Sequence, residues 1–363
     1  MLISDLTTMR VGGPIRTLVQ PTTQAELVDA ARAAWAAGDD VLVLGGGSNV
    51  IVSDEGFDGT VIHVATRGVE VLSSGETVRL RVQAGEPWDA LVAHTVAQGW
   101  AGVEALSGIP GSAGAAPIQN IGAYGQELSA TLVAIDFLDY LSGEVVRLAA
   151  ADLGLGYRTS VIKQGREGVV LAIEIELTPG DGAVAYPQLA TALGVAMGTR
   201  VPLAQVREHV LALRASKGMV LDATDPDSVS CGSFFTNPIV GENFARGLPD
   251  AAPRWPVAPE PAPVAVPLDA DPAHVPSPAL PPASDDRVKL SAAWLIEQAG
   301  IRRGFSLPGS QAAISSKHTL AITNRGGATA EQVAELARFV QACVLAQFGL
   351  LLQPEPVAVG LEI

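Results

Sequence analysis

Two glycine-rich tracts are the parts of this sequence best suited to bind a ligand. The first, Gly45-Gly46-Gly47-Ser48-Asn49, directly follows an apolar run at 41–44. Its small side chains let backbone amides approach an anion closely, as a pyrophosphate requires. Val50 stands where a dinucleotide-binding fingerprint has its third glycine, and the Lys-Ser/Thr pair of a nucleoside triphosphate loop is missing. The tract therefore predicts either a pyrophosphate cradle or a plain strand-to-loop turn.

The second tract runs from 108 to 125 as GIPGSAGAAPIQNIGAYG and is too long and too rich in small residues for an ordinary turn. Side chains are missing where another group presses close to the backbone. A flat cofactor lying against bare backbone would explain this, with Gln119 and Asn120 offering amide hydrogen bonds to the edge of a heterocycle. The alternative is a long glycine-rich loop without a ligand.

The elements that position these tracts can be predicted from the spacing of apolar residues, which follows a helical period in some segments and alternates in others. Thr23 and Glu26 form a capping-box pattern that predicts the start of a helix, and Gly38 predicts its end. The strand expected over 169–177 alternates polar and apolar residues, which predicts a half-exposed antiparallel strand. This mixture favours the α+β class. The periodicity predicts helices over 23–38, 87–99, 202–214 and 329–349, and strands over 41–44, 61–64, 78–82, 133–138, 145–148 and 169–177. A further folded segment is expected over 294–299, ahead of Gly300.

Length and composition exclude several classes of protein. The 363 residues suggest two or three domains, and no apolar run reaches the roughly 18 residues that would span a membrane. The net charge of −15 gives no basic surface for non-specific binding of nucleic acid or anionic membranes. Two cysteines and an N-terminus without a signal pattern predict a reducing cytoplasm and no disulfide framework. The five histidines belong to no ligand-spaced motif, so we expect no bound metal.

A proline-rich stretch interrupts the second half of the chain. Residues 249–282 contain 12 of the 25 prolines, and proline lacks an amide donor. We therefore expect no regular element in this stretch. It is either a semi-rigid polyproline loop or an unfolded insertion, and the second interpretation, a solvent-exposed mobile loop, is the one we favour.

The two tracts, with Arg10-Val-Gly-Gly13 before them, resemble the FAD-binding half of the UDP-N-acetylenolpyruvoylglucosamine reductase family, flavoproteins that make UDP-N-acetylmuramate. The resemblance covers nearly the whole chain apart from the proline-rich stretch. Further matches stand in the order of the family: GYRTS at 156–160, SKGMVLD at 216–222, GSFFTNP at 232–238, KLSAAWLIE at 289–297 and PEP at 354–356.

This resemblance implies an α+β fold in which a two-lobed FAD-binding domain of the vanillyl-alcohol-oxidase (PCMH) type precedes an α+β substrate-binding domain. The lobes are expected at 1–65 and 66–200. The substrate-binding domain is expected at 201–363, with the helix over 202–214 as its hinge and the last segment returning to the active site. It also implies that NADPH reduces non-covalently bound FAD, which then reduces UDP-N-acetylglucosamine enolpyruvate.

By the same resemblance, Ser233 donates the proton, while Arg158 and Glu355 act at the substrate carboxylate and the developing carbanion. Hydride addition to an enol ether conjugated with a carboxylate leaves negative charge that a guanidinium can clamp, and a placed hydroxyl can then deliver a proton. Taken singly, the three would be an ordinary surface arginine, a turn cap and a solvated carboxylate. Cys231 has no histidine tied to it by a motif, so we expect a small buried residue rather than a nucleophile.

The remaining implied contacts divide between cofactor and substrate. Tyr186 resembles a residue that caps the substrate, Lys217 one that contacts its diphosphate, and Asn237 one that contacts the pyrophosphate or uridine. At Ala115 and Ala116 some family members have hydroxyl residues, so two hydrogen bonds to the flavin pyrophosphate are absent. The resemblance implies cofactor contacts at Gly45, Gly46, Gly47, Ser48, Asn49, Ile109, Pro110, Gly111, Gly114, Ile118, Gln119, Asn120, Gly122 and Ala123.

Two rival functions stay open from the sequence. One is another flavoenzyme of the same superfamily that oxidises a hydroxy acid or sugar with oxygen. The other is a catalytically silent binder of flavin or nucleotide sugars. Intact positions for Ser233, Arg158 and Glu355 argue against both. We expect a cytoplasmic monomer that takes a nucleotide-sugar substrate and binds neither nucleic acid nor membrane.

Overall fold

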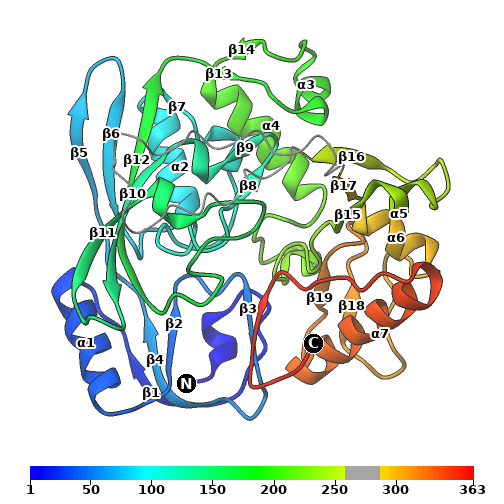
Figure 1. Cartoon of the computed structure of the whole chain (residues 1–363), viewed down its shortest axis with the longest axis horizontal. Coiled ribbons are helices and arrows are strands. Elements are labelled where there is room, and N and C mark those ends of the chain that lie inside the picture. The colour runs from blue at the N-terminus through cyan, green and yellow to red at the C-terminus, as the bar shows by residue number, and fades with distance from the viewer. Residues whose placement is uncertain (258–286) are drawn as a thin grey trace, which may run out of the picture. The chain divides into compact units, whose positions relative to one another are not determined.

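The computed structural model describes residues 1–257 and 287–363, which form two compact units (Figure 1). The first unit comprises Met1–Phe234, Arg303–Arg338 and Glu355–Ile363. The second comprises Phe339–Pro354 and the described part of Phe235–Arg302. Both contain helices and strands, so the expected α+β class is confirmed. None of the helices in these described ranges has the length and apolar character needed to cross a membrane.

The first sheet is parallel and carries the first glycine-rich tract at its edge. Its strand order is β1 (Ile15–Val19), β4 (Phe57–His63), β2 (Val41–Leu44), and the tract begins where β2 ends. Helix α1 (Gln24–Ala36) begins with the predicted capping box, because Thr23 Oγ1 accepts from the Glu26 amide at 3.2 Å. The Glu26 carboxylate accepts from the Thr23 amide in return, also at 3.2 Å. The predicted helix and strand are confirmed.

The second sheet is antiparallel and has six strands. Five follow the order β11, β10, β12, β6, β5, and β7 pairs with the end of β12. The strands expected near 78, 133, 145 and 169, and the helix expected from 87, are confirmed. Their bounds are β5 (Val69–Ser74), β6 (Val78–Gln83), α2 (Trp88–Ala97), β7 (Trp100–Ala101), β10 (Leu132–Asp139), β11 (Val145–Ala149) and β12 (Gly168–Pro179).

Strand β12 is not half exposed, so that prediction is wrong. Both of its faces are covered, because Val169 and Leu171 pack into the core that includes α1, whereas Ile173 and Ile175 pack into the core that includes α2. Its polar Glu174 is buried in ion pairs with Arg79 of the neighbouring strand β6 and Arg147 of β11, which lies beyond β10. A paired carboxylate of this kind gives the same alternation as a solvated one.

A short strand pair brings the C-terminus beside the first tract. Strand β20 (Val357–Val359) pairs in parallel with β3 (Val50–Val52), about three hundred residues earlier in the chain. The helix expected over 202–214 is confirmed as α4 (Leu203–Ala215) and packs with α3 (Pro187–Leu193). The smaller strands of this unit are β8 (Gly122–Ala123), β9 (Gln126–Glu127), β13 (Gly182–Ala183), β14 (Arg200–Val201), β18 (Ala312–Ile314) and β19 (Ile322–Asn324). Its 3-10 turns are Ile3–Leu6, Glu104–Leu106, Leu128–Ala130, Ala150–Leu153 and Pro226–Ser228.

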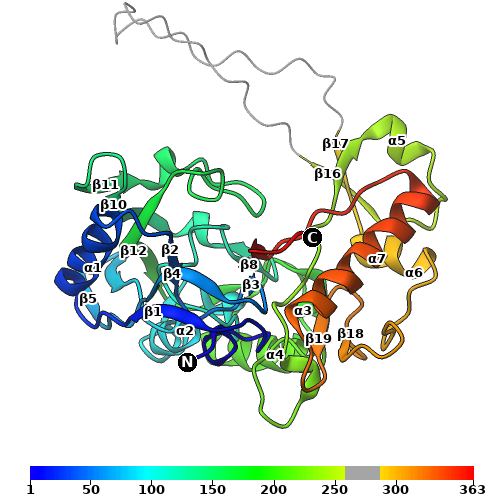
Figure 2. The same ribbon diagram turned by 90° about the horizontal axis from the view of Figure 1, so that it is seen from below.

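The second unit contains a three-stranded antiparallel sheet in the order β15 (Ile239–Gly241), β17 (Arg287–Leu290), β16 (Arg254–Val257). Its helices are α5 (Glu242–Arg246) and α6 (Ala292–Gln298), and the long α7 (Ala330–Phe348) ends in it. Figure 2 shows α6 beside the end of α7, where the Trp294 and Phe348 ring centroids lie 5.8 Å apart. The predicted helix over 329–349 is confirmed as α7, and the folded segment expected over 294–299 falls largely within α6.

The proline-rich stretch was expected to hold no regular element from residue 249 onward, and β16 corrects this. Pro256 fits because β16 is an edge strand, where a missing amide donor is tolerated. Residues 258–286, and with them the predicted mobile loop, lie outside the described part of the chain. The expected domain boundaries at 65 and 200 remain predictions, although residues 1–65 and 66–200 each contribute one large sheet.

Candidate active site

A cavity of about 390 Å³ in the first unit brings both glycine-rich tracts together, and it has the size of a small-molecule site. Of the seventeen residues predicted to contact cofactor or substrate, twelve line it. From the tracts these are Gly45, Gly46, Gly47, Ser48, Asn49, Ile109, Pro110, Gly111, Ile118, Gln119 and Gly122, and Lys217 follows α4. The three predicted catalytic residues Arg158, Ser233 and Glu355 line it as well.

With the catalytic three included, fifteen of the twenty predicted site residues line the cavity, and the other five lie outside its lining. Asn120 is 1% exposed, and its side-chain amide donates to the Gly156 carbonyl at 3.1 Å, which ties the second tract to the segment before Arg158. In the second unit, Asn237 Oδ1 accepts from the Ala292 amide at 3.0 Å at the start of α6. The roles of these five as ligand contacts stay predictions: Gly114, Asn120, Ala123, Tyr186 and Asn237.

The first tract presents a row of unused backbone donors to the cavity. Within the described residues, the amides of Gly46, Gly47, Ser48 and Asn49 donate no hydrogen bond. Consecutive free N–H groups of this kind attract an anion such as a phosphate. The tract also lies tightly against the second one, since a Cβ atom added to Gly46 would come within 2.7 Å of the Gly111 Cα. Close backbone packing therefore already requires a glycine at position 46.

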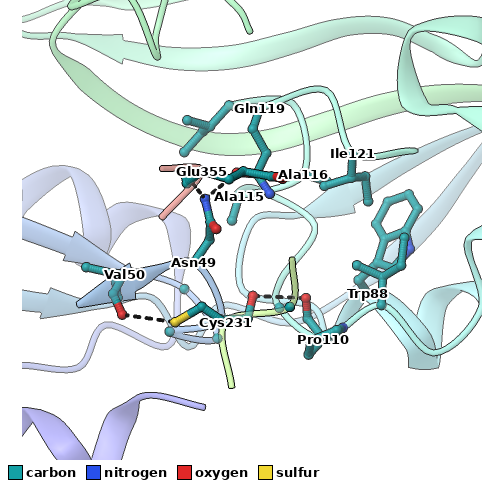
Figure 3. A pocket seen from close by; sticks show the side chains of 18 of the residues that line it. Asn49, Val50, Trp88, Pro110, Ala115, Ala116, Gln119, Ile121, Cys231 and Glu355 are labelled. Atoms are coloured by element: carbon teal, nitrogen blue, oxygen red, sulfur yellow. Dashed lines mark hydrogen bonds between the residues drawn. The ribbon is translucent and has the colours of Figure 1, made fainter. Parts of the chain in front are cut away.

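Asn49 joins both tracts to the C-terminal segment (Figure 3). Its Nδ2 donates to the side-chain oxygen of Gln119 and, at 3.2 Å, to the backbone carbonyl of Glu355. The Asn49 carbonyl accepts from the Val357 amide at 3.0 Å, next to the pairing of β3 with β20. This network carries Glu355 to the cavity from the far end of the sequence.

Arg158 is held in place from three sides. Its terminal nitrogens donate to the carbonyls of Gly122 at 2.7 Å and Asn120 at 3.3 Å, and its Nε lies 3.2 Å from the Glu355 carboxylate. Its backbone has φ of +55°, a conformation that costs a non-glycine residue energy. The side chains of Arg158 and Glu355 are 21% and 13% exposed, so the pair is largely shielded from water.

The electrostatics of this pair involve a second cation. Burial raises the pKa of Glu355, while the positive charges of Arg158 and Lys163 act in the opposite direction. Burial also lowers the pKa of Lys163, whose ammonium donates to the Glu355 carbonyl at 3.3 Å. The carboxyl of Glu355 is thus a buried acid whose protonation depends on two neighbouring cations.

Ser233 and Cys231 line the same cavity but differ in chemistry. Within the described residues, no hydrogen bond engages the Ser233 hydroxyl. The Cys231 thiol donates to the Val50 carbonyl at 3.6 Å, and burial raises its pKa to about 12. The expectation that Cys231 is a small buried residue is confirmed, and its raised pKa favours the neutral thiol, which is a poor nucleophile.

A glutamine and two tyrosines surround Lys217. Its ammonium donates to Gln188 Oε1 at 2.9 Å and lies 5.6 Å from the ring centroid of Tyr124. The Tyr124 ring meets that of Tyr186 edge-on, with centroids 5.6 Å apart. The predicted substrate residues Tyr186 and Lys217 are therefore both in contact with Tyr124, which itself lines the cavity.

The sequence reasoning missed Tyr124, Arg214 and His318, which also line the cavity. Arg214 donates to the Met219 carbonyl at 2.8 Å, and its Nε is buried without a hydrogen-bond partner in the described part of the chain. Two signals were available: Tyr124 is the single aromatic residue of the second tract, and Arg214 stands three residues before Lys217. His318 follows no pattern that would have marked it.

The cavity therefore combines free amides suited to a phosphate and apolar wall residues such as Ala115 and Ile121. It also contains the Ser233 hydroxyl and three cations, those of Arg158, Arg214 and Lys217. Such a site can bind an anionic cofactor against bare backbone. It can also stabilise charge that develops on a carboxylate and supply a proton to a carbon beside it.

Family models match two parts of the chain. A model described as an FAD binding domain matches residues 15–149, which contain both glycine-rich tracts. A model described as the C-terminal domain of UDP-N-acetylenolpyruvoylglucosamine reductase matches residues 225–359, which contain Ser233 and Glu355.

Individual proteins match over almost the full length. The UDP-N-acetylenolpyruvoylglucosamine reductase of Leifsonia xyli subsp. xyli is 60% identical over 99% of this chain and 98% of its own length. The enzyme of the same name from Saccharopolyspora erythraea is 50% identical over 98% of this chain and 94% of its own. The crystal structure of the UDP-N-acetylenolpyruvylglucosamine reductase from Thermus caldophilus has a TM-score of 0.64 at 25% identity, and it covers 99% of this chain and 97% of that one.

Proposed function

Because this chain belongs to the UDP-N-acetylenolpyruvoylglucosamine reductase family, we propose that it uses FAD and NADPH to reduce UDP-N-acetylglucosamine enolpyruvate to UDP-N-acetylmuramate. The expected two-part fold, an FAD-binding domain of the PCMH type followed by a substrate-binding domain, is confirmed. The observation that supports the proposal most is that Arg158, Ser233 and Glu355 meet in one cavity with the free amides of the first tract. The product would enter peptidoglycan synthesis, and we propose a cytoplasmic monomer.

The hydrogen-bond donors and the small residues that line the cavity suit FAD. The free amides of Gly46 to Asn49 suit the pyrophosphate, and the unbranched Ala115 and Ala116 leave bare backbone for a flat ring. These alanines offer no hydroxyl donor, so the backbone would carry the pyrophosphate alone. When bound, FAD supplies hydride transfer from NADPH to the enolpyruvyl group.

Arg158 holds the substrate carboxylate in this proposal. Each of its terminal nitrogens carries two N–H groups and uses one on a backbone carbonyl, so a second N–H on each remains for the substrate. A guanidinium is permanently charged and matches a carboxylate with two parallel hydrogen bonds. As negative charge spreads into the carboxylate, its interaction with Arg158 strengthens, which lowers the barrier.

Ser233 delivers the proton to the carbon next to the carboxylate. A serine hydroxyl is a weak acid, so it must be close to the carbon and must act on a strongly basic carbanion. Glu355 reaches the same region through its ion pair with Arg158 and can hydrogen-bond the substrate or the group that reprotonates Ser233. Lys217, with Tyr186 beside the same tyrosine ring, is proposed to contact the nucleotide diphosphate.

Gly46→Ala tests the cofactor cradle. The added Cβ would come within 2.7 Å of the Gly111 Cα, so the tracts must move apart. We expect the purified variant to contain less FAD than the wild type, as measured by the ratio of flavin absorbance to protein absorbance. Gly75→Ala is the matched control, because nothing lies within 4 Å of the Cβ it adds. Full FAD content in Gly46→Ala would contradict the assignment.

The proposed activity is tested by steady-state turnover of the purified protein. NADPH absorbance should fall only when UDP-N-acetylglucosamine enolpyruvate is present, and mass spectrometry should identify a product heavier by two hydrogens. Consumption of NADPH without the substrate, with oxygen as the acceptor, would favour an oxidase. Binding of FAD and substrate without turnover would instead identify a catalytically silent binder.

A further inference from the structure

Lys163 reaches the Glu355 segment from the chain that follows Arg158. Its backbone amide donates to Ser160 Oγ at 3.2 Å, and Ser160 Oγ donates to the Ile118 carbonyl at 2.6 Å. These bonds fix the start of the lysine side chain against the second glycine-rich tract. At its far end, Nζ donates to the Glu355 carbonyl at 3.3 Å. Lys163 thus joins the second tract to the C-terminal segment.

The Glu355 carbonyl receives two donors from different parts of the chain. Asn49 Nδ2 donates to it at 3.2 Å from the first tract, and Lys163 Nζ donates from the other. The Glu355 amide donates to the Phe234 carbonyl at 2.8 Å, directly beside Ser233. The backbone of Glu355 is therefore fixed on both sides, and its carboxyl is held by the ion pair with Arg158.

The charge of Lys163 acts on that carboxyl as well. Among the described residues, the charged groups that act on the Glu355 carboxyl are Arg158, which pairs with it, and Lys163. Both lie on the chain segment between β11 and β12, whereas Glu355 lies just before β20. A partly buried ammonium is costly unless a negative group compensates it, and Glu355 is that group.

We propose that Lys163 is a positioning residue for Glu355, holding its backbone carbonyl and favouring the ionised form of its carboxyl. The inference rests on the proposed function, since Glu355 matters only if the cavity performs the reduction. Lys163 itself is outside the cavity lining, and its effect on the reaction runs through Glu355. Lys163 would therefore support the three predicted catalytic residues from outside the cavity.

The sign of the effect follows from the charge. Removing the ammonium removes one of two cations that lower the pKa of Glu355, so this pKa rises further. If Glu355 acts ionised, the acidic limb of the pH profile moves to higher pH. If it acts protonated, the basic limb does so. The limb that reports Glu355 moves to higher pH in either case.

The test uses Lys163→Met and Lys163→Arg in the FAD-loaded protein. The flavin is reduced anaerobically with NADPH, and its reoxidation by UDP-N-acetylglucosamine enolpyruvate is followed by stopped flow across a range of pH. We expect the Glu355 limb of Lys163→Met to move to higher pH and Lys163→Arg to restore the wild-type profile. Arg303→Met is the control, because it removes one positive charge from an exposed position outside the cavity lining.

An unmoved limb in Lys163→Met, or an equal movement in Arg303→Met, would overturn the inference. If Lys163→Met does not fold, Lys163→Gln removes the charge but keeps a donor, and the same upward movement is expected. Loss of bound FAD from both neutral variants would also contradict the inference, because it would make Lys163 part of the cofactor site. A wild type that is not reoxidised by the substrate would refute the proposed function instead, so the two failures are distinguishable.

Discussion

Ser233→Ala is expected to leave flavin reduction by NADPH unchanged and to slow flavin reoxidation by the enolpyruvyl substrate about 10²- to 10⁴-fold, the usual contribution of a placed general acid. The two half-reactions separate because a proton donor to carbon is needed only in the second one. Stopped-flow absorbance of the flavin measures each half-reaction by itself.

Cys231→Ala is the matched control for Ser233→Ala. Cys231 lines the same cavity two residues away, and its pKa of about 12 leaves it a neutral thiol bonded to the Val50 carbonyl. We expect its reoxidation rate to stay close to that of the wild type. Equal loss of both half-reactions in Ser233→Ala, or an equal loss in Cys231→Ala, would refute the proton-donor assignment.

Arg158→Met is expected to reduce the reoxidation rate about 10²- to 10³-fold, the loss typical of removing a group that stabilises charge in a transition state. The variant also leaves Glu355 without its ion pair and two backbone carbonyls without their donors. Arg158→Lys keeps the charge but not the fork of donors, so we expect a loss between wild type and Arg158→Met.

The kinetic pattern distinguishes this role from a purely structural one. Because the interaction strengthens as charge develops, kcat should fall more than the substrate affinity. Arg16→Met is the control, since it removes an arginine of the first sheet that is 46% exposed. Full activity of Arg158→Lys would contradict a bidentate clamp, and an equal kcat loss in Arg16→Met would contradict any local role.

Local patterns were enough to predict most of the helices and strands. The capping box at Thr23 predicted the start of α1, and apolar periodicity predicted α2, α4 and α7. The same patterns could not distinguish a buried ion pair from a solvated carboxylate, which is why the exposure of β12 was predicted wrongly at Glu174. They also could not predict that Pro256 lies in an edge strand, because edge position is a property of the sheet.

The candidate site could be predicted in its parts but not in its connections. The glycine content of the two tracts predicted bare backbone beside a ligand, and both tracts line the cavity. The bonds from Asn49 and Lys163 to the Glu355 carbonyl join residues far apart in the chain, and no local spacing encodes them. The positive φ of Arg158 is equally hidden, since arginine is not a residue type that marks such a conformation.

The most direct test of the central claim is the flavin absorbance of the purified protein under anaerobic conditions, first with NADPH and then with UDP-N-acetylglucosamine enolpyruvate. The proposed function predicts that NADPH bleaches the flavin bands and that their colour returns only when the enolpyruvyl substrate is added. A protein that bleaches but does not recover would contradict the assigned substrate while leaving the flavin site intact. A colourless protein that also fails to take up added FAD would contradict the account as a whole.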